Sequence, residues 1–292
     1  MESFKEKYGP WALVVGSSEG LGECFANECA SRGLNVVLCA RTISRADLEK
    51  VEKNIRETYG VDVRIVEADI SEEESGDIIV KGIDDLEVGF VIFNAAIEPG
   101  GSFIRIKPED HQKAIIGNCV TPTKVVWYLA RKMAKRKRGG IYLISSIAAE
   151  GGIANWVSYG ASKSYEMILG EGLWYEMKAY GVDAGTYVVG STETPNFKKG
   201  QEKHGTGLTG DSKPEGIDTD SLQTGVVPRT PTFVASYLFD QIGKGPRLYS
   251  HPDDLDSMTK MRMISREDYV NAISQTTTKY HIGGMNELLE DV

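Results

Sequence analysis

A run of five apolar residues, 11–15, passes directly into a turn that contains Gly16, Gly20 and Gly22, and a helical pattern follows over residues 21–32. Glycines let the backbone turn tightly and approach a ligand closely, and the first amides of a helix can bind a pyrophosphate. The spacing Gly-x-x-x-Gly-x-Gly differs from the commoner Gly-x-Gly-x-x-Gly. This segment predicts a strand, turn and helix that bind a dinucleotide, with a plain strand-to-helix connection as the alternative.

Strand-like and helix-like segments continue to alternate along the chain. The patterns predict further strands at 35–40, 61–68, 88–93, 141–144, 182–189 and 247–249. They predict further helices at 45–59, 72–83, 108–137, 156–180, 232–242 and 266–274. Such alternation predicts an α/β fold with a doubly wound parallel sheet and helices on both faces, in which ligands bind outside the carboxyl ends of the strands.

Composition argues against several other classes of protein. The formal net charge of −9 disfavours a nucleic-acid surface, because binding to phosphates needs many exposed cations. The four cysteines form no Cys-x-x-Cys pair and the four histidines are scattered, so we expect neither a metal site nor a disulfide framework. Because the sequence has no signal peptide and no apolar run of about 18 residues, we expect a cytoplasmic protein without a membrane span.

Tyr159 and Lys163 lie four residues apart in the predicted helix 156–180, so they stand on one face of it. A tyrosine hydroxyl ordinarily has a pKa near ~10, and a fixed cation beside it lowers that pKa, which would let Tyr159 exchange protons near neutral pH. Ser145 and Ser146 end the strand that precedes this helix. The alternative is that Tyr159 and Lys163 are two surface residues of an amphipathic helix.

The end of the second strand carries a basic residue. Arg41 and Thr42 follow residues 35–40, with no carboxylate to accept a hydrogen bond from a ribose 2′-hydroxyl. A guanidinium can bind a 2′-phosphate through two parallel hydrogen bonds. This position therefore favours NADP over NAD, with an exposed strand-end cation as the alternative.

The ends of the third and fourth strands supply further candidates. Asp69 and Ile70 follow the third strand, where Asp69 is a candidate acceptor for an adenine amino group or else a helix N-cap. Asn94, Ala95 and Ala96 follow the fourth strand, and these small residues would let a cofactor ring lie against the backbone.

Together these motifs resemble the short-chain dehydrogenase/reductase family over roughly residues 8–250. The resemblance implies a single-domain Rossmann fold and hydride transfer between a nicotinamide cofactor and a carbonyl or secondary alcohol carbon. With the positional candidates above, it gives as cofactor-binding residues Gly16, Ser17, Ser18, Glu19, Gly20, Leu21, Gly22, Arg41, Thr42, Asp69, Ile70, Asn94, Ala95, Ala96, Tyr159, Lys163, Thr192 and Thr194. The residues that match the family's catalytic tetrad are Asn118, Ser146, Tyr159 and Lys163.

The tetrad resemblance also implies a role for each residue. Tyr159 would donate or remove the proton of the substrate oxygen, and Ser146 would hydrogen-bond that oxygen. Lys163 would lower the tyrosine pKa and hold the nicotinamide ribose, while Asn118 would hold a water that links Lys163 to solvent. Ser146 is preferred over Ser145 because it precedes Tyr159 by the family's usual separation.

Residues 6–9, 55–61 and 68–69 further resemble bacterial NADP-dependent 7β-hydroxysteroid dehydrogenases, which act on bile acids. This implies a role in lipid metabolism, with a hydroxysteroid or bile acid as the secondary alcohol or ketone. A 3-oxoacyl thioester reductase is the alternative enzyme, and Lys198, Lys199 and Lys203 would suit its phosphopantetheine or CoA. A non-catalytic dinucleotide-sensing protein is the alternative of another class, although the intact tetrad argues against it.

We expect residues 1–250 to form the catalytic domain and residues 251–292 to form a C-terminal extension packed on it. Residues 191–230 lack periodicity and are expected to be either a lid over the substrate or an insertion without a substrate role. Trp156 and Glu98 are possible pocket residues, with a core tryptophan and a solvated glutamate as the alternatives. Family resemblance implies a homodimer or homotetramer.

Overall fold

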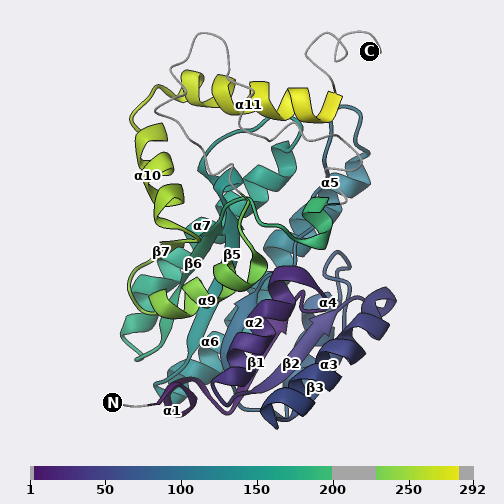
Figure 1. Cartoon of the computed structure of the whole chain (residues 1–292), viewed down its shortest axis with the longest axis vertical. Coiled ribbons are helices and arrows are strands. Elements are labelled where there is room, and N and C mark those ends of the chain that lie inside the picture. The colour runs from purple at the N-terminus through teal and green to yellow at the C-terminus, as the bar shows by residue number, and fades with distance from the viewer. Residues whose placement is uncertain (1–2, 199–227, 283–292) are drawn as a thin grey trace.

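Residues 3–198 and 228–282 are described by a computed structural model, and within them seven strands form one parallel sheet in the order β3-β2-β1-β4-β5-β6-β7 (Figure 1). The strands are β1 (Trp11–Val15), β2 (Asn35–Ala40), β3 (Val63–Glu67), β4 (Val88–Phe93), β5 (Gly140–Ser146), β6 (Asp183–Val189) and β7 (Arg247–Tyr249). The strand order reverses between β1 and β4, where ligands bind in open α/β sheets. The predicted doubly wound α/β fold is confirmed.

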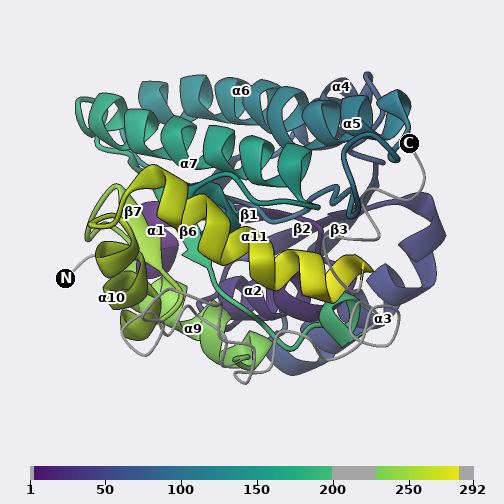
Figure 2. The ribbon, with the colours of Figure 1, turned by 90° about the horizontal axis from the view of Figure 1, so that it is seen from above.

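Helices cover both faces of this sheet (Figure 2). The helices are α1 (Phe4–Tyr8), α2 (Gly20–Ser31), α3 (Arg45–Tyr59), α4 (Ser75–Ile83), α5 (Pro108–Ile115), α6 (Thr121–Arg136), α7 (Val157–Lys178), α9 (Pro231–Gln241), α10 (Pro252–Met261) and α11 (Arg266–Ile282), with the short turns η1 (Thr42–Ser44), η2 (Ile116–Val120) and η3 (Ile147–Glu150). Helices α4, α6 and α7 lie on one face, and α2, α3 and α9 lie on the other.

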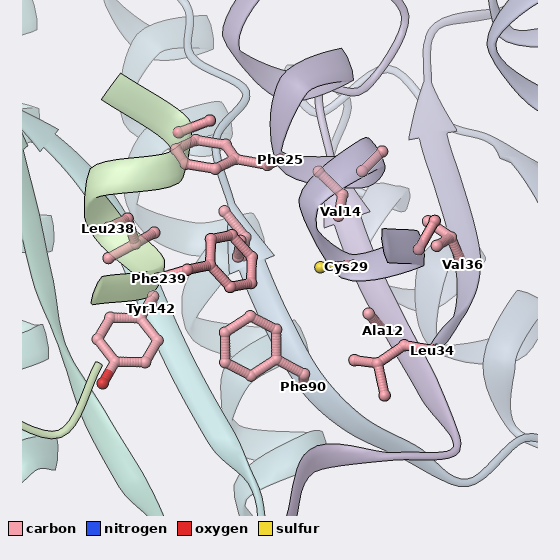
Figure 3. Close-up of a cluster of buried hydrophobic side chains, with 14 of the residues drawn as sticks. Ala12, Val14, Phe25, Cys29, Leu34, Val36, Phe90, Tyr142, Leu238 and Phe239 are labelled. Atoms are coloured by element: carbon pink, nitrogen blue, oxygen red, sulfur yellow. The ribbon is translucent and has the colours of Figure 1, made fainter. Parts of the chain in front are cut away.

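The strands are apolar along their whole length because both of their faces are buried. Successive side chains of a strand point to opposite faces of the sheet. Val14 and Phe90 therefore pack with Phe25 of α2 and Leu238 of α9 (Figure 3). Leu13 points the other way and packs in the cluster under α4, α6 and α7. A near-continuous apolar run is the sequence pattern expected of such strands.

The continuous helix predicted for residues 108–137 is wrong in one respect. The structure has α5 and α6 in this region, but the five residues of η2 between them form a π-helical turn. A π turn inserts one extra residue into a helix without ending it and is frequent at functional sites. This turn carries Asn118, whose side chain is fully buried.

The described part of the C-terminal extension packs against the end of the sheet. Met258 and Met261 of α10 and Tyr269 of α11 form a cluster with Met167 of α7 and Val188 of β6. Helix α11 lies across the top of the view in Figure 1, beyond the carboxyl ends of the strands. Sequence analysis did not identify α10 or α1 as helices.

Glu150 holds this extension to the sheet. Its carboxylate is 5% exposed and accepts hydrogen bonds from Arg247 at 3.0 Å, Arg262 at 2.6 Å and the Tyr249 hydroxyl at 2.6 Å. Burial alone would raise the pKa of Glu150, but the hydrogen bonds and charges of these partners outweigh it and lower the pKa. Arg266 of α11 also donates to the Glu150 carbonyl at 2.9 Å.

Most of the expected lid lies outside the described residues, because these stop at 198 and resume at 228. Lys199 and Lys203 also fall in that interval, and residues 283–292 of the extension lie outside the described part as well. None of the helices in the described part of the chain is long and apolar enough to cross a membrane.

Glu150→Gln tests the link between the extension and the sheet. We expect this change to lower the free energy of unfolding at pH 7 by roughly 2–4 kcal/mol, because it leaves two guanidinium groups without their shared counter-charge. The carboxylate has a lowered pKa, so its contribution is present above the unfolded-state pKa and is lost as pH falls through the folded-state value. Urea unfolding at pH 7 and pH 4 measures both effects.

Glu49→Gln provides the control, because Glu49 pairs with Arg45 on the exposed surface of α3. We expect it to change the free energy of unfolding by less than about 1 kcal/mol. Equal effects of the two variants at pH 7 would contradict the role assigned to Glu150.

Candidate active site

The glycine turn after β1 is shaped by close backbone contacts. Gly16 has φ +85, and a Cβ there would lie 2.7 Å from the backbone of Ala95. A Cβ at Gly22 would lie 1.8 Å from the Gly16 carbonyl oxygen. That same oxygen accepts a hydrogen bond from the Asn94 side chain at 3.1 Å. The residue that ends β4 therefore fixes the turn that follows β1, and only glycine fits at positions 16 and 22.

A pocket of about 850 Å³ opens at the carboxyl ends of the central strands. The predicted site residues that line it are Gly16, Ser18, Glu19, Gly20, Leu21, Arg41, Ile70, Asn94, Ala95, Ala96, Ser146, Tyr159, Lys163, Thr192 and Thr194. Five predicted residues are not part of its lining: Ser17, Gly22, Thr42, Asp69 and Asn118. The structure thus brings most of the candidates to one place.

Helix α7 carries Tyr159 and Lys163 into this pocket because it lies very close to the sheet. A Cβ at Gly170 would lie 2.9 Å from the backbone of Gly185 in β6, and one at Gly160 would lie 3.0 Å from the Ala148 carbonyl oxygen. Small residues on the inner face of α7 therefore set its distance from β5 and β6.

The two serines at the end of β5 have different roles. The hydroxyl of Ser145 is buried and donates to the Lys163 carbonyl oxygen at 2.7 Å, which attaches β5 to α7. The Ser146 hydroxyl accepts from the Ala148 amide at 3.2 Å and interacts with the hydroxyl of Tyr159. Ser146 is therefore the serine that is placed to act with Tyr159.

The pKa of Tyr159 is raised in this structure, whereas the sequence analysis expected Lys163 to lower it. Burial raises the pKa of Tyr159, and the Glu98 carboxylate raises it further. The hydrogen bond with Ser146 lowers it, while Glu166 again raises it. The Lys163 ammonium lies 5.9 Å from the centre of the Tyr159 ring. Two carboxylates thus act on the tyrosine where the sequence pattern indicated only a cation.

The side chain of Asn118 forms three hydrogen bonds within the protein. Its amide nitrogen donates to the Ile97 carbonyl oxygen and to the Ser162 hydroxyl, both at 2.8 Å, and its amide oxygen accepts from the Ile97 amide at 2.8 Å. Both amide hydrogens are used in these bonds, so a water of the kind that the tetrad resemblance implied would have to donate to the amide oxygen, which has a second lone pair. The observed role of Asn118 is to join the π turn, α7 and the segment after β4.

Arg41 lies at the rim of the pocket, and its side chain makes no hydrogen bond or ion pair with the described residues. Its neighbour Arg45 is instead paired with Glu49 at 2.8 Å and Glu67 at 2.7 Å. Thr42 is also engaged, because its hydroxyl hydrogen-bonds with Glu67. Arg41 is therefore the basic side chain at the end of β2 that is available to an anion.

Asp69 is engaged within its own turn. Its carboxylate accepts hydrogen bonds from the Ser71 amide at 3.0 Å and the Ser71 hydroxyl at 2.7 Å. This arrangement is a local turn of the kind that aspartate favours. The side chain of Ser17 is buried and accepts from the Cys39 amide at 3.0 Å, so it stabilises the β1 turn against β2.

The segment after β6 returns over the glycine turn. Thr194 accepts from the Phe197 amide at 3.1 Å, and an added Cβ at Gly20 would lie 3.4 Å from Thr194. Thr192 is buried, donates to the Gly190 carbonyl at 3.1 Å and pairs with Arg229 in a short parallel bridge. Both threonines line the pocket, as the sequence predicted.

Several residues outside the predicted catalytic and cofactor-binding sets also line the pocket. Trp156 and Glu98 are two of them, which was one of the two possibilities left open by the sequence, and the Glu98 side chain is exposed there. Met258, Tyr269 and Ile273 of the extension also line it. Desolvation by the pocket walls raises the pKa of Glu98, and the Lys163 charge lowers it in part. The signal for an inward-facing extension was the helical spacing of Met258 and Met261, three residues apart, and of Tyr269 and Ile273, four residues apart.

Comparisons with known proteins agree with this geometry. The family model for short chain dehydrogenases matches residues 10–205. A 7beta-hydroxysteroid dehydrogenase of Collinsella aerofaciens is 27% identical over 91% of this chain and 95% of that protein. One from Clostridium sardiniense is 28% identical over 76% of this chain and 84% of that protein. A solved structure from a study of 7beta-hydroxysteroid dehydrogenase stereoselectivity matches with a TM-score of 0.81 and 26% identity, over 94% of this chain and 99% of that chain.

Gly22→Ala tests the shape of the glycine turn. Because the new Cβ would lie 1.8 Å from the Gly16 carbonyl oxygen, we expect the free energy of unfolding to fall by more than about 3 kcal/mol and dinucleotide binding to be lost. Urea unfolding and fluorescence titration with NADPH measure the two effects. Gly172→Ala on α7 is the control, since a Cβ there meets nothing within 4 Å, and it should raise helix stability by up to about 1 kcal/mol. Unchanged stability and binding in Gly22→Ala would contradict the turn geometry.

Proposed function

Because the chain belongs to the short-chain dehydrogenase family, we propose that it is an NADP-dependent oxidoreductase that interconverts a secondary alcohol and a ketone, with a hydroxysteroid or bile acid as substrate. The observation that carries the proposal is the meeting of Ser146, Tyr159 and Lys163 at one pocket beside the glycine turn. Predicted residues from seven separate segments of the chain converge there, at the carboxyl ends of the strands, where parallel folds bind ligands.

The residues around the glycine turn fit a dinucleotide. Gly16 and Gly20 line the pocket without a side chain, and α2 begins at Gly20, so its N-terminus, which can bind a phosphate, lies at the pocket. Arg41 supports NADP, because its free guanidinium can bind a 2′-phosphate and residues 40–42 have no carboxylate. When bound, a nicotinamide cofactor supplies the hydride or accepts it.

Tyr159 and Ser146 would handle the proton and the oxygen of the substrate. In the direction of ketone reduction, the Tyr159 hydroxyl donates its proton to the carbonyl oxygen, and in alcohol oxidation the phenolate removes the hydroxyl proton. Ser146 donates a hydrogen bond to the same oxygen and lowers the pKa of Tyr159. Lys163 is held close to Tyr159 and binds the nicotinamide ribose in this proposal.

The wall opposite the cofactor residues supports a bulky apolar substrate. It is built from side chains of η3, α10, α11 and neighbouring segments: Ile147, Ile153, Trp156, Phe197, Met258, Tyr269 and Ile273. Apolar surface of this extent suits the rings of a steroid, and the pocket falls in the range of about 300–1,000 Å³ that is common for small-molecule sites. Relatives named 7beta-hydroxysteroid dehydrogenase match most of the chain, which points to the same substrate class.

We further propose a homodimer or homotetramer in the cytoplasm. Large apolar side chains are exposed along the outer faces of α6 and α7, with Trp127 58%, Ile168 59% and Tyr175 75% exposed. These two helices lie side by side in Figure 2. An exposed apolar face of this kind supports association with a second copy of the chain.

Tyr159→Phe tests the catalytic assignment. We expect turnover of NADPH with keto bile acids to fall at least about 10³-fold, because the proton donor is removed, while NADPH affinity changes by less than about threefold. The measurement is the initial rate across keto and hydroxy bile acids, 3-oxoacyl thioesters and cyclic ketones. Tyr165→Phe, on the same helix and paired with Thr123, should retain activity. Near-normal activity of Tyr159→Phe would contradict the mechanism, and turnover of thioesters alone would contradict the steroid substrate.

Arg41→Gln tests the choice of cofactor. Loss of a charge-assisted contact to the 2′-phosphate should raise the Kd of NADPH by about 10- to 100-fold and leave the Kd of NADH within about threefold. Arg45→Gln is the matched control, because that guanidinium is already paired with Glu49 and Glu67. Fluorescence titrations measure the Kd of NADPH and of NADH for each variant. An equal loss of affinity for both cofactors would contradict the role of Arg41.

A further inference from the structure

The carboxylate of Glu166 lies beside Lys163, on the buried face of α7. Glu166 follows Lys163 by three residues on α7 and is completely buried. Its Oε2 atom accepts a hydrogen bond from the Lys163 ammonium at 2.7 Å, and the same ammonium donates to the Ile144 carbonyl oxygen at 2.8 Å. Its Oε1 atom is buried and has no hydrogen-bond partner among the described residues.

This arrangement lowers the stability of the folded protein. A buried carboxylate oxygen without a partner costs about 1–3 kcal/mol, and buried ion pairs are often no more stable than apolar side chains of similar size. The Lys163–Glu166 pair as a whole is therefore not explained by a gain in stability, and the position of Glu166 beside Lys163 needs another explanation.

The contacts of Lys163 explain the position of Glu166. An ammonium has three N–H donors, and Glu166 and Ile144 take two of them, which leaves the third for the pocket. The negative charge of Glu166 also balances the positive charge of Lys163 next to Tyr159.

We propose that Glu166 is a positioning residue, which holds the Lys163 ammonium in place for the cofactor ribose. Its negative charge also balances the positive charge of Lys163. Tyr159 therefore exchanges its proton at a higher pH than it would beside Lys163 alone. The inference rests on the proposed function for its kinetic part. The ionisable groups that act together with Glu166 are Lys163 and Tyr159 on α7, Cys119 on η2, and Glu98 on the segment after β4.

Glu166→Gln separates charge from position, because an amide oxygen can still accept from Lys163 but carries no charge. Burial raises the pKa of Glu166 to about 7, so its charge is present above that pH. In the variant, the rising limb of kcat/KM against pH for alcohol oxidation should move about one unit toward lower pH, because one carboxylate that opposes ionisation of Tyr159 is gone. The NADPH Kd should stay within about threefold.

Glu166→Met removes both the charge and the acceptor. We expect the NADPH Kd to rise about tenfold and kcat to fall at least about tenfold, because Lys163 is no longer anchored. Glu176→Gln is the matched control, since it removes an exposed carboxylate from the same helix about 15 Å further along its axis and should leave the pH profile unchanged.

A thermal double-mutant cycle with Lys163→Met tests the pair without any substrate. At pH 8, Glu166→Gln should lower the Tm of the wild type but leave unchanged or raise the Tm of Lys163→Met, because the carboxylate has lost its counter-charge there. An additive cycle, or a Glu166→Gln pH profile that coincides with the wild type, would overturn the proposal. Failure of the wild type to turn over any compound tested would count against the proposed function alone, since the cycle and the NADPH titrations do not depend on a substrate.

Discussion

The pairing of β1 with β4 is the constraint on which the site depends. The chain winds away from β1 in two directions, so the helices that follow β1 and β4 lie on opposite faces and leave their carboxyl ends uncovered. The register of this pair then brings Ala95 within contact of Gly16, and the Asn94 amide bonds the Gly16 carbonyl oxygen. A dinucleotide turn formed by one strand is thus held in shape by the end of its neighbour.

The polar inner face of α7 is the second feature that organises the site. Ser162, Lys163 and Glu166 are buried between this helix and β5, and such groups are tolerated only when they are paired. Ser162 bonds Asn118 and the Tyr159 carbonyl oxygen, while Lys163 bonds Glu166. The network links the π turn, the end of β5 and Tyr159, the proposed proton donor. The site therefore holds buried polar groups that an apolar interface would not need, which is common where function opposes stability.

The sequence predicted the sheet well because a buried parallel strand has a strong signal. Residues 35–40, 88–93 and 247–249 form strands with the predicted bounds, and the helix 45–59 is also as predicted. The π turn in η2 was missed because one inserted residue barely alters the apolar spacing of a helix. Asp69 illustrates another limit: from the sequence, a carboxylate after a strand suits an adenine or its own turn equally well, and only the structure shows that one of its oxygens bonds Ser71. For Glu166, spacing places it near Lys163 but does not tell whether that face of the helix is buried.

The extension joins the apolar side of the pocket to the segment that carries Ser146. Glu150 lies four residues after Ser146 and binds Arg262 at the end of α10, while its carbonyl accepts from Arg266 at the start of α11. Those two helices supply Met258, Tyr269 and Ile273 to the pocket. The predicted cofactor residues of the glycine turn and of the segments after β2 and β4, in contrast, make none of these contacts. Substitutions in α10 and α11 can therefore reshape the substrate side while the dinucleotide side keeps its geometry, and the same sheet can accept different alcohols without altering how the cofactor is held.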